Sequence, residues 1–265
     1  MSGFYVGVDG KARKIKGGYI GIDGVARKIK KGYIGVDGVA RLCWIDNPFD
    51  PVFANNTWEE IAIACQTGNV PDSWAVGDQK TMTINGANYT IDIIGKYHDD
   101  YADGSGKAPL TFQLHDCYNT IYKMNSSGTN SGGWTNCAMR TSNLASFVTL
   151  MPTEVQNGIK EVNKLTSAGY ASTTINTTAD KLFLLSEIEV FGKLKCTCEG
   201  EGTQYAYYAA GNSACKTLNG IANVWWTRSP YATNTIQFAV VKSDGTASDS
   251  SNANTARGLA FAFCF

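Results

Sequence analysis

The C-terminal stretch, residues 224–265, constrains the fold of this chain more than any other part, because two apolar, aromatic segments there flank a polar one. The flanking segments are 224–230, which includes two adjacent tryptophans, and 257–265. Between them, 18 of the 25 residues in 231–255 are Asn, Thr, Ser, Asp, Tyr or Ala. A rigid frame that carries a permissive polar insert is typical of a recognition surface. We therefore expect the flanking segments to be buried and the insert to be exposed.

The order of apolar and polar residues in this stretch predicts which side chains are buried. Both faces of 259–265 are apolar, which predicts a central strand buried on both sides. Within the insert we expect a core-facing row and an opposite, outward row, formed respectively by Ile236, Phe238 and Val240 and by Thr235, Gln237, Ala239 and Val241. Asp244-Gly245 predicts a turn, and the polar run 248–254 has no apolar periodicity, which predicts an exposed loop.

Three residues of the frame are interpreted as structural. Trp225 and Trp226 are neighbours in a predicted strand and point to opposite faces, so at least one of them belongs to the core. Arg228 follows them, and a buried pairing is favoured over a ligand contact. These residues are therefore kept out of the predicted binding surface.

Residues 3–44 form an internal repeat with a period of 14 residues. The positions that match are Tyr5, Tyr19 and Tyr33; Asp9, Asp23 and Asp37; Gly10, Gly24 and Gly38; and Arg13, Arg27 and Arg41. Asp-Gly between two strand-like runs predicts a two-residue hairpin turn. We therefore divide the chain into three β-hairpin repeats in 1–45, a linker in 46–56 and a ligand-binding domain in 57–265. Because small hairpins bury little alone, the repeats are expected to form an oligomerisation module or an anchor.

Charge and cysteine content limit the classes of partner. Residues 1–45 carry nine Lys or Arg against three Asp, but they match no nucleic-acid-binding fold, so a structural tether is favoured and no nucleic-acid partner is expected. The sequence shows neither a secretory signal nor an apolar run long enough to span a membrane, which predicts folding in a bacterial cytoplasm and no membrane partner. The eight cysteines are then expected to be reduced.

The domain is expected to mix short strands with two or three helices. A capping box at Thr57–Glu60 predicts a helix, and Asn85-Gly86 predicts a hairpin in 80–95. We also expect a strand in 110–114, a helical segment in 139–147, a helix from Pro152 with Val155, Ile159 and Val162 on one face, and a strand in 180–185. This succession indicates an α+β domain.

No catalytic or metal site is predicted. The sequence lacks a nucleophile elbow, a phosphate loop, a zinc-binding H-E-x-x-H and a dinucleotide fingerprint. His98 and His115 are few for a zinc site, and Cys196-Thr197-Cys198 is too closely spaced for one. The acidic loop Asp99–Asp103 is interpreted as a solvated turn, with calcium binding left open. We expect no cofactor and no enzymatic activity.

Four segments recur in the same order in a known family: Gly132-Gly133-Trp134 with Met139-Arg140; Asp180-Lys181-Leu182-Phe183-Leu184-Leu185-Ser186 with Glu189-Val190; Trp225-Trp226-Thr227-Arg228-Ser229-Pro230; and Arg257-Gly258-Leu259-Ala260-Phe261-Ala262-Phe263. Over 55–265 the chain resembles an uncharacterised family of gut Firmicutes and their phages with a C-type lectin-like fold. Relatives include the variable proteins of diversity-generating retroelements, among them phage tail-tip adhesins, and more distantly the formylglycine-generating enzymes. The repeats resemble N-terminal modules of phage structural proteins.

The resemblance implies a phage tail-associated receptor-binding protein, carried in the virion, that binds a host-cell surface protein or glycan. Its N-terminal repeats would contact other phage structural proteins, and a homo-oligomer, taken as a trimer, is expected. The composition of 231–255 is what retroelement mutagenesis at adenines leaves, although a selected Ser/Asn loop would look the same. The expected ligand-binding residues are Tyr231, Thr233, Asn234, Thr235, Gln237, Ala239, Ser248, Ser250, Asn252 and Asn254.

Two alternatives stay open at this point. An oxidase like the formylglycine-generating enzymes would need a redox-active or metal-binding cysteine pair, for which the candidates are Cys196, Cys198, Cys215 and Cys264. A bacterial cell-surface adhesin is the other alternative, and the lack of a recognisable signal peptide disfavours it.

Overall fold

The computed structural model describes residues 5–8, 11–14, 18–29, 31–36, 39–45 and 49–265. Each 14-residue repeat forms an antiparallel hairpin, and the three hairpins are β1 (Tyr5–Val8) with β2 (Lys11–Lys14), β3 (Gly18–Ile22) with β4 (Val25–Ile29), and β5 (Lys31–Val36) with β6 (Val39–Ile45). At the middle turn, Asp23 and Gly24 have φ of 53° and 74°, as an Asp-Gly hairpin turn requires. The equivalent Asp9, Gly10, Asp37 and Gly38, and residues 46–48 of the linker, lie outside the described residues.

The core of the domain is a five-stranded sheet in the order β12-β18-β9-β8-β7. These strands are Leu182–Phe183, Ala262–Cys264, Thr111–Leu114, Ala87–Gly95 and Gln79–Ile84. Helix α1 (Trp58–Thr67) contributes Trp58, whose ring packs edge-on against Phe112 and Phe265. Helix α4 (Thr153–Gly158) packs beside α1. This aromatic cluster seals the end of the sheet next to α1.

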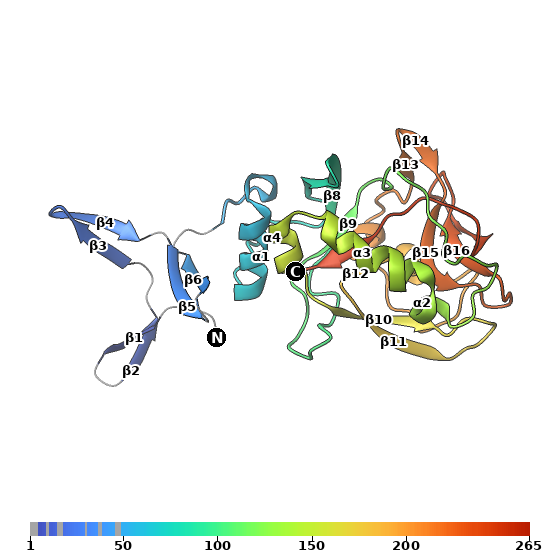
Figure 1. Ribbon diagram of the computed structural model, residues 1–265, viewed down its shortest axis with the longest axis horizontal. Helices are drawn as coiled ribbons and strands as arrows, with labels where there is room; N and C mark the ends of the chain where they lie inside the picture. The colour runs from blue at the N-terminus through green and yellow to red at the C-terminus, as the bar shows by residue number, and fades with distance from the viewer. Residues whose placement is uncertain (1–4, 9–10, 15–17, 30, 37–38, 46–48) are drawn as a thin grey trace.

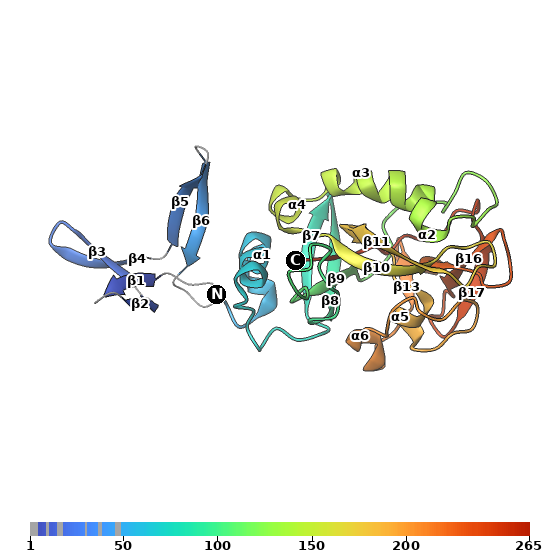
Figure 2. The same ribbon diagram turned by 90° about the horizontal axis from the view of Figure 1, so that it is seen from below.

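A second, three-stranded antiparallel sheet has the order β15-β16-β17, with strands Trp225–Pro230, Gln237–Val241 and Ser248–Asn252. Figures 1 and 2 place this sheet at the end of the domain opposite α1, in orange and red. Two further antiparallel hairpins are formed by β10 (Val162–Ser167) with β11 (Ile175–Asp180) and by β13 (Lys216–Leu218) with β14 (Ile221–Asn223). The remaining elements are short: η1 (Phe53–Asn55), α2 (Gly133–Asn136), η2 (Met139–Leu144), α3 (Ala145–Phe147), η3 (Val148–Leu150), α5 (Glu187–Phe191) and α6 (Ala206–Ala209).

Several expectations are confirmed. The domain mixes sheets with a few short helices, as an α+β chain does. The capping box of α1 is complete, because Thr57 and Glu60 each bond to the other's backbone N–H. The β7–β8 hairpin turns at Asn85-Gly86, and every residue of 259–265 is fully buried, with β18 in the interior of its sheet. Among the described residues, no helix is long and apolar enough to cross a membrane.

Other expectations are wrong in detail. The helix that begins after Pro152 ends at Gly158, and Val162 lies in strand β10. A Cβ on Gly158 would lie 2.7 Å from the Cβ of Ala62, so close packing on α1 fixes this position. The strand predicted in 180–185 is confined to Leu182–Phe183, because Asp180 belongs to β11.

The insert also differs from its predicted pattern. Ile236, expected to face the core, is 39% exposed because it precedes β16. Within β16, residues 238–241 are all buried, so the alternation between a buried and an outward row does not hold there. The polar run expected to be a loop is largely strand β17, which pairs along the whole of β16. Backbone pairing therefore orders a segment that lacks apolar periodicity.

Candidate functional site

The frame of the C-terminal stretch is held by a fully buried arginine. Arg228 of β15 forms a bidentate ion pair with Glu189 of α5, and it also donates to the carbonyl oxygens of Leu165, Leu184 and Glu201. Its neighbours Trp225 and Trp226 are both fully buried. The interpretation of these residues as structural is confirmed, because no part of them reaches the surface.

A second buried cation, Lys164, pairs with the same Glu189 carboxylate as Arg228. The Lys164 ammonium lies 2.7 Å from a carboxylate oxygen of Asp99 and 2.8 Å from one of Glu189. It also donates to the Tyr205 hydroxyl at 3.0 Å. Burial alone would lower the pKa of Lys164, but the two carboxylates outweigh it and the pKa is raised. Lys164 therefore stays charged inside the domain.

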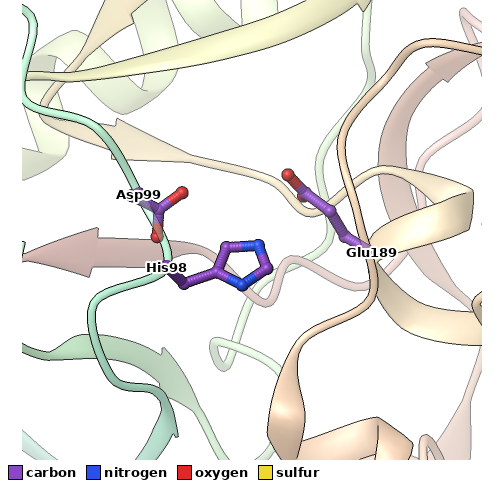
Figure 3. Close-up of side chains that lie close together, drawn as sticks. All are labelled: His98, Asp99 and Glu189. Atoms are coloured by element: carbon purple, nitrogen blue, oxygen red, sulfur yellow. The ribbon is translucent and has the colours of Figure 1, made fainter. Parts of the chain in front are cut away.

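His98, Asp99 and Glu189 bring their ligand-type atoms within 4.8 Å of one another, as a metal centre would (Figure 3). However, the Lys164 ammonium already lies between the two carboxylates. The His98 ring stacks on Tyr205 with a centroid distance of 4.0 Å, and burial lowers the pKa of His98. The cluster is thus an internal ion network in which an ammonium supplies the positive charge.

The acidic loop is split between two environments. Asp99 is buried, which corrects its interpretation as part of a solvated turn. Asp100 pairs with Lys107 at the surface, and Asp103 accepts from the backbone of Ser105. The three carboxylates therefore bond to separate partners rather than to one central point.

The first part of the polar insert, 231–237, is attached to the domain by Asn130. This asparagine is fully buried. Its side-chain amide donates to the carbonyl oxygens of Asn234 at 2.7 Å and Gln237 at 2.8 Å, and its backbone N–H donates to that of Thr235 at 2.9 Å. Asn130 thereby fixes the backbone of the insert, while the insert's own side chains bond locally: the Asn234 side-chain oxygen accepts the backbone N–H of Ile236.

Asn130 also positions an aromatic residue that sequence analysis missed. Its side-chain oxygen accepts the backbone N–H of Tyr170 at 2.8 Å, and Tyr170 is 64% exposed. Tyr170 and Ala171 both have positive φ, of 55° and 58°, which is uncommon for residues with a side chain. A Cβ on Gly169 would lie 1.9 Å from the Asn130 carbonyl oxygen, so only glycine fits there. In the sequence, Gly169-Tyr170 in a Ser/Thr-rich segment could have indicated an exposed loop with an aromatic residue. The link of this loop to 231–237 through Asn130 arises only in the fold.

The ten predicted surface residues fall into three groups. Thr233, Asn252 and Asn254 are exposed. The group with intermediate exposure comprises Tyr231, Asn234, Thr235, Gln237 and Ser250. The prediction that Ala239 and Ser248 belong to the surface is wrong, because both are buried. Ala239 lies in the central strand of its sheet, and the Ser248 hydroxyl donates to the buried carboxylate of Glu187.

The cysteines proposed for an oxidase do not form a pair. Cys264 is buried in β18, and burial raises its pKa well above the ordinary value. Cys198 and Cys215 donate to the carbonyl oxygens of Ser172 and Ser243. All seven cysteines whose side chains are described are free, and Cys43 lies outside that set. Burial also raises the pKa of Cys196, so neither Cys196 nor Cys264 has the depressed pKa of a reactive thiolate.

The fold and the surface define a mixed α/β domain. Its end remote from α1 presents a polar insert, whose charged residues are Lys242, Asp244 and Asp249, next to a buried ion network. The chain belongs to the family described as Domain of unknown function (DUF6273), whose model matches residues 110–265. The match spans β9 to the C-terminus and includes Lys164, Glu189 and Arg228. Searches of curated proteins and of solved structures gave no match.

Proposed function

We propose that this protein is a non-enzymatic phage receptor-binding protein, associated with the tail and carried in the virion. Its domain would be of the C-type lectin-like type, and the exposed part of 231–255 would bind a protein or glycan of the host-cell surface. The observation that carries the proposal is the position of this polar insert, which is attached to the rigid frame at the end of the domain opposite α1 (Figures 1 and 2).

The chemistry of the exposed residues supports this function. Thr233, Asn252 and Asn254 are exposed, short, uncharged side chains. The exposed Tyr170 is linked to the insert through Asn130, which bonds both to the Tyr170 backbone N–H and to the Asn234 carbonyl oxygen. Tyrosine with small polar residues is the composition that antibody loops use for adaptable binding, since it provides contact area and hydrogen bonds at low entropic cost. The backbone beneath can stay constant while these side chains vary, which also suits diversification by a retroelement.

The N-terminal repeats complete the proposal. Among the described residues, each hairpin pairs only within itself and forms a two-stranded sheet. Such hairpins are marginal alone, which favours stabilisation by other copies of the chain or by phage structural proteins. A trimer would multiply the weak affinity of one surface. Light scattering should then give three times the chain mass, and a monomer that persists at high concentration would exclude the trimer.

Host range tests the proposed function. In a phage that carries this chain, the exposed residues of 231–255 are exchanged among Ser, Asn and Thr, and adsorption to a panel of gut Firmicutes is measured. The proposal predicts an altered or abolished host range with an unchanged unfolding midpoint. An unchanged host range with intact folding would contradict it.

A further inference from the structure

A pocket of about 400 Å³ opens on a different part of the domain from the polar insert. It lies where the start of β8, the loop after β9 and the β13–β14 hairpin meet. The lining residues that concern its chemistry are Asn88, Tyr89, Asp116, Asn119 and Thr217. This volume is at the lower end of the range for ligand sites, so the pocket suits a small ligand.

One side of the pocket is aromatic. The ring of Tyr89 stacks on that of Tyr118, with centroids 5.2 Å apart and planes inclined by 16°. Tyr118 is buried and packs edge-on against Phe147, so the ring beneath Tyr89 is fixed. Tyr89 itself stays partly exposed. A rigidly held, partly exposed tyrosine ring offers an apolar face to the C–H groups of a ligand.

Polar groups around the ring retain hydrogen-bonding capacity. Asp116 uses one carboxylate oxygen to accept the backbone N–H of Thr217 at 2.6 Å. The side-chain oxygens of Asn88 and Asn119 accept from Thr83 and Thr120. Within the described part of the chain, the second oxygen of Asp116 and both amide NH₂ groups make no hydrogen bond, so one strong acceptor and two donors are available to a ligand.

The charged residues at the pocket argue against phosphate, carboxylate and calcium as its ligands. Lys216, on the adjoining strand β13, points its ammonium at the carbonyl oxygens of Leu114 and His115, at 2.6 and 2.9 Å, and not into the pocket. The pocket lining therefore contains no cation for a phosphate or carboxylate. A single carboxylate is also too few for a calcium site.

We propose that this pocket binds one unit of a neutral sugar. The sugar ring would lie against Tyr89, and its hydroxyl groups would donate to Asp116 and accept from Asn88 and Asn119. A neutral sugar is the ligand class that needs an apolar contact, donors and an acceptor together without a balancing charge. The site is separate from the polar insert, and the inference does not rest on the proposed function.

Ligand-observed saturation-transfer NMR on the full chain tests the proposal, with the methyl glycosides of glucose, galactose and N-acetylglucosamine as probes. The key variant is Asn119→Ala, because its exposed side chain can be removed without opening the core. Asp116→Asn is a second variant that retains an oxygen for the Thr217 N–H and removes the charge. Asn69→Ala is the matched control at an exposed asparagine that lines neither the pocket nor the polar insert.

We expect transfer to at least one glycoside and a dissociation constant about tenfold weaker in each pocket variant, because each variant removes or weakens one hydrogen bond to the sugar. Asn69→Ala should bind as the parent does. Absence of transfer to all three glycosides would overturn the proposal. So would a signal that survives both pocket variants, or one that Asn69→Ala weakens as much as they do.

Discussion

Arg228 and Glu189 meet in a bidentate ion pair that is almost completely removed from solvent, although 39 positions separate them in the chain. Burial alone would raise the pKa of Glu189, but Arg228 and Lys164 reverse this and hold it below its ordinary value. The pair joins α5 to β15 and so holds the strand that leads into the polar insert. This ion pair therefore fixes the strand from which the proposed binding surface extends.

Loss of this arginine should strongly destabilise the domain. Arg228→Met leaves the Glu189 carboxylate buried without its bidentate partner, which typically costs about 3–5 kcal/mol. Urea unfolding measures the change. Lys107→Met is the matched control, because it breaks an exposed pair with Asp100 and should cost less than about 1 kcal/mol. Equal losses in the two variants would show that the buried pair has no special role.

Asp99 should make stability depend on pH at the acid end. Burial would raise its pKa, but Lys164 and the Thr111 hydroxyl outweigh burial and lower the pKa from 3.8 to about 2. A carboxyl with a depressed folded-state pKa adds stability above its unfolded pKa, and this stability is lost as the pH falls from about 4 towards 2. Asp99→Asn should lower stability at neutral pH and flatten this part of the profile. Denaturation midpoints across that pH range test this, with exposed Asp72→Asn as the control. Identical slopes in parent and Asp99→Asn would contradict it.

Asn130→Ala should loosen two surface segments together. The substitution removes the partner of the Tyr170 N–H and of the Asn234 and Gln237 carbonyl oxygens. We expect a loss of about 1–3 kcal/mol in the free energy of unfolding and faster hydrogen exchange at the Tyr170 amide. Asn176→Ala, which removes one long hydrogen bond to Thr135, serves as the control. If Tyr170 exchange is as slow in Asn130→Ala as in the parent, Asn130 does not hold this loop.

The sequence predicted the structural features that depend on residues close together in the chain. The capping box, the Asn85-Gly86 hairpin and the burial of 259–265 follow from neighbouring residues, and the structure contains all three. The errors arise where distant parts of the chain meet. Ser248 looks like an exposed serine until Glu187, 61 positions away, accepts its hydroxyl.

The ion network was invisible for the same reason. Asp99 and Lys164 lie 65 positions apart, and nothing in either local sequence indicates that they pair. Tyr170 belongs beside the polar insert only because Asn130 bonds to both segments. A buried polar contact leaves no periodic signal in the sequence, in contrast to an apolar strand face.

Tyr170→Ala should weaken attachment to host cells by about tenfold or more, because exposed aromatic residues at the centre of binding surfaces carry much of the binding energy. Flow cytometry with the labelled chain measures attachment. Tyr97→Ala is a close control, since Tyr97 is 54% exposed, also has a positive φ of 52° and lies outside the proposed surface. An equal effect of the two substitutions, or none from Tyr170→Ala, would remove Tyr170 from the binding surface.

The most direct test of the proposed binding surface compares two triple variants of the purified chain in attachment to host cells. The first changes the three exposed residues of the polar insert that were predicted to bind the ligand, Thr233, Asn252 and Asn254, to alanine. The second changes three exposed residues near α1 in the same way: Asn55, Asn69 and Thr81. Both variants should unfold at the same denaturant concentration as the parent. We predict that the first loses attachment by about tenfold or more and that the second keeps it. Undiminished attachment of the first variant, with its fold intact, would contradict the assignment of the polar insert as the binding surface.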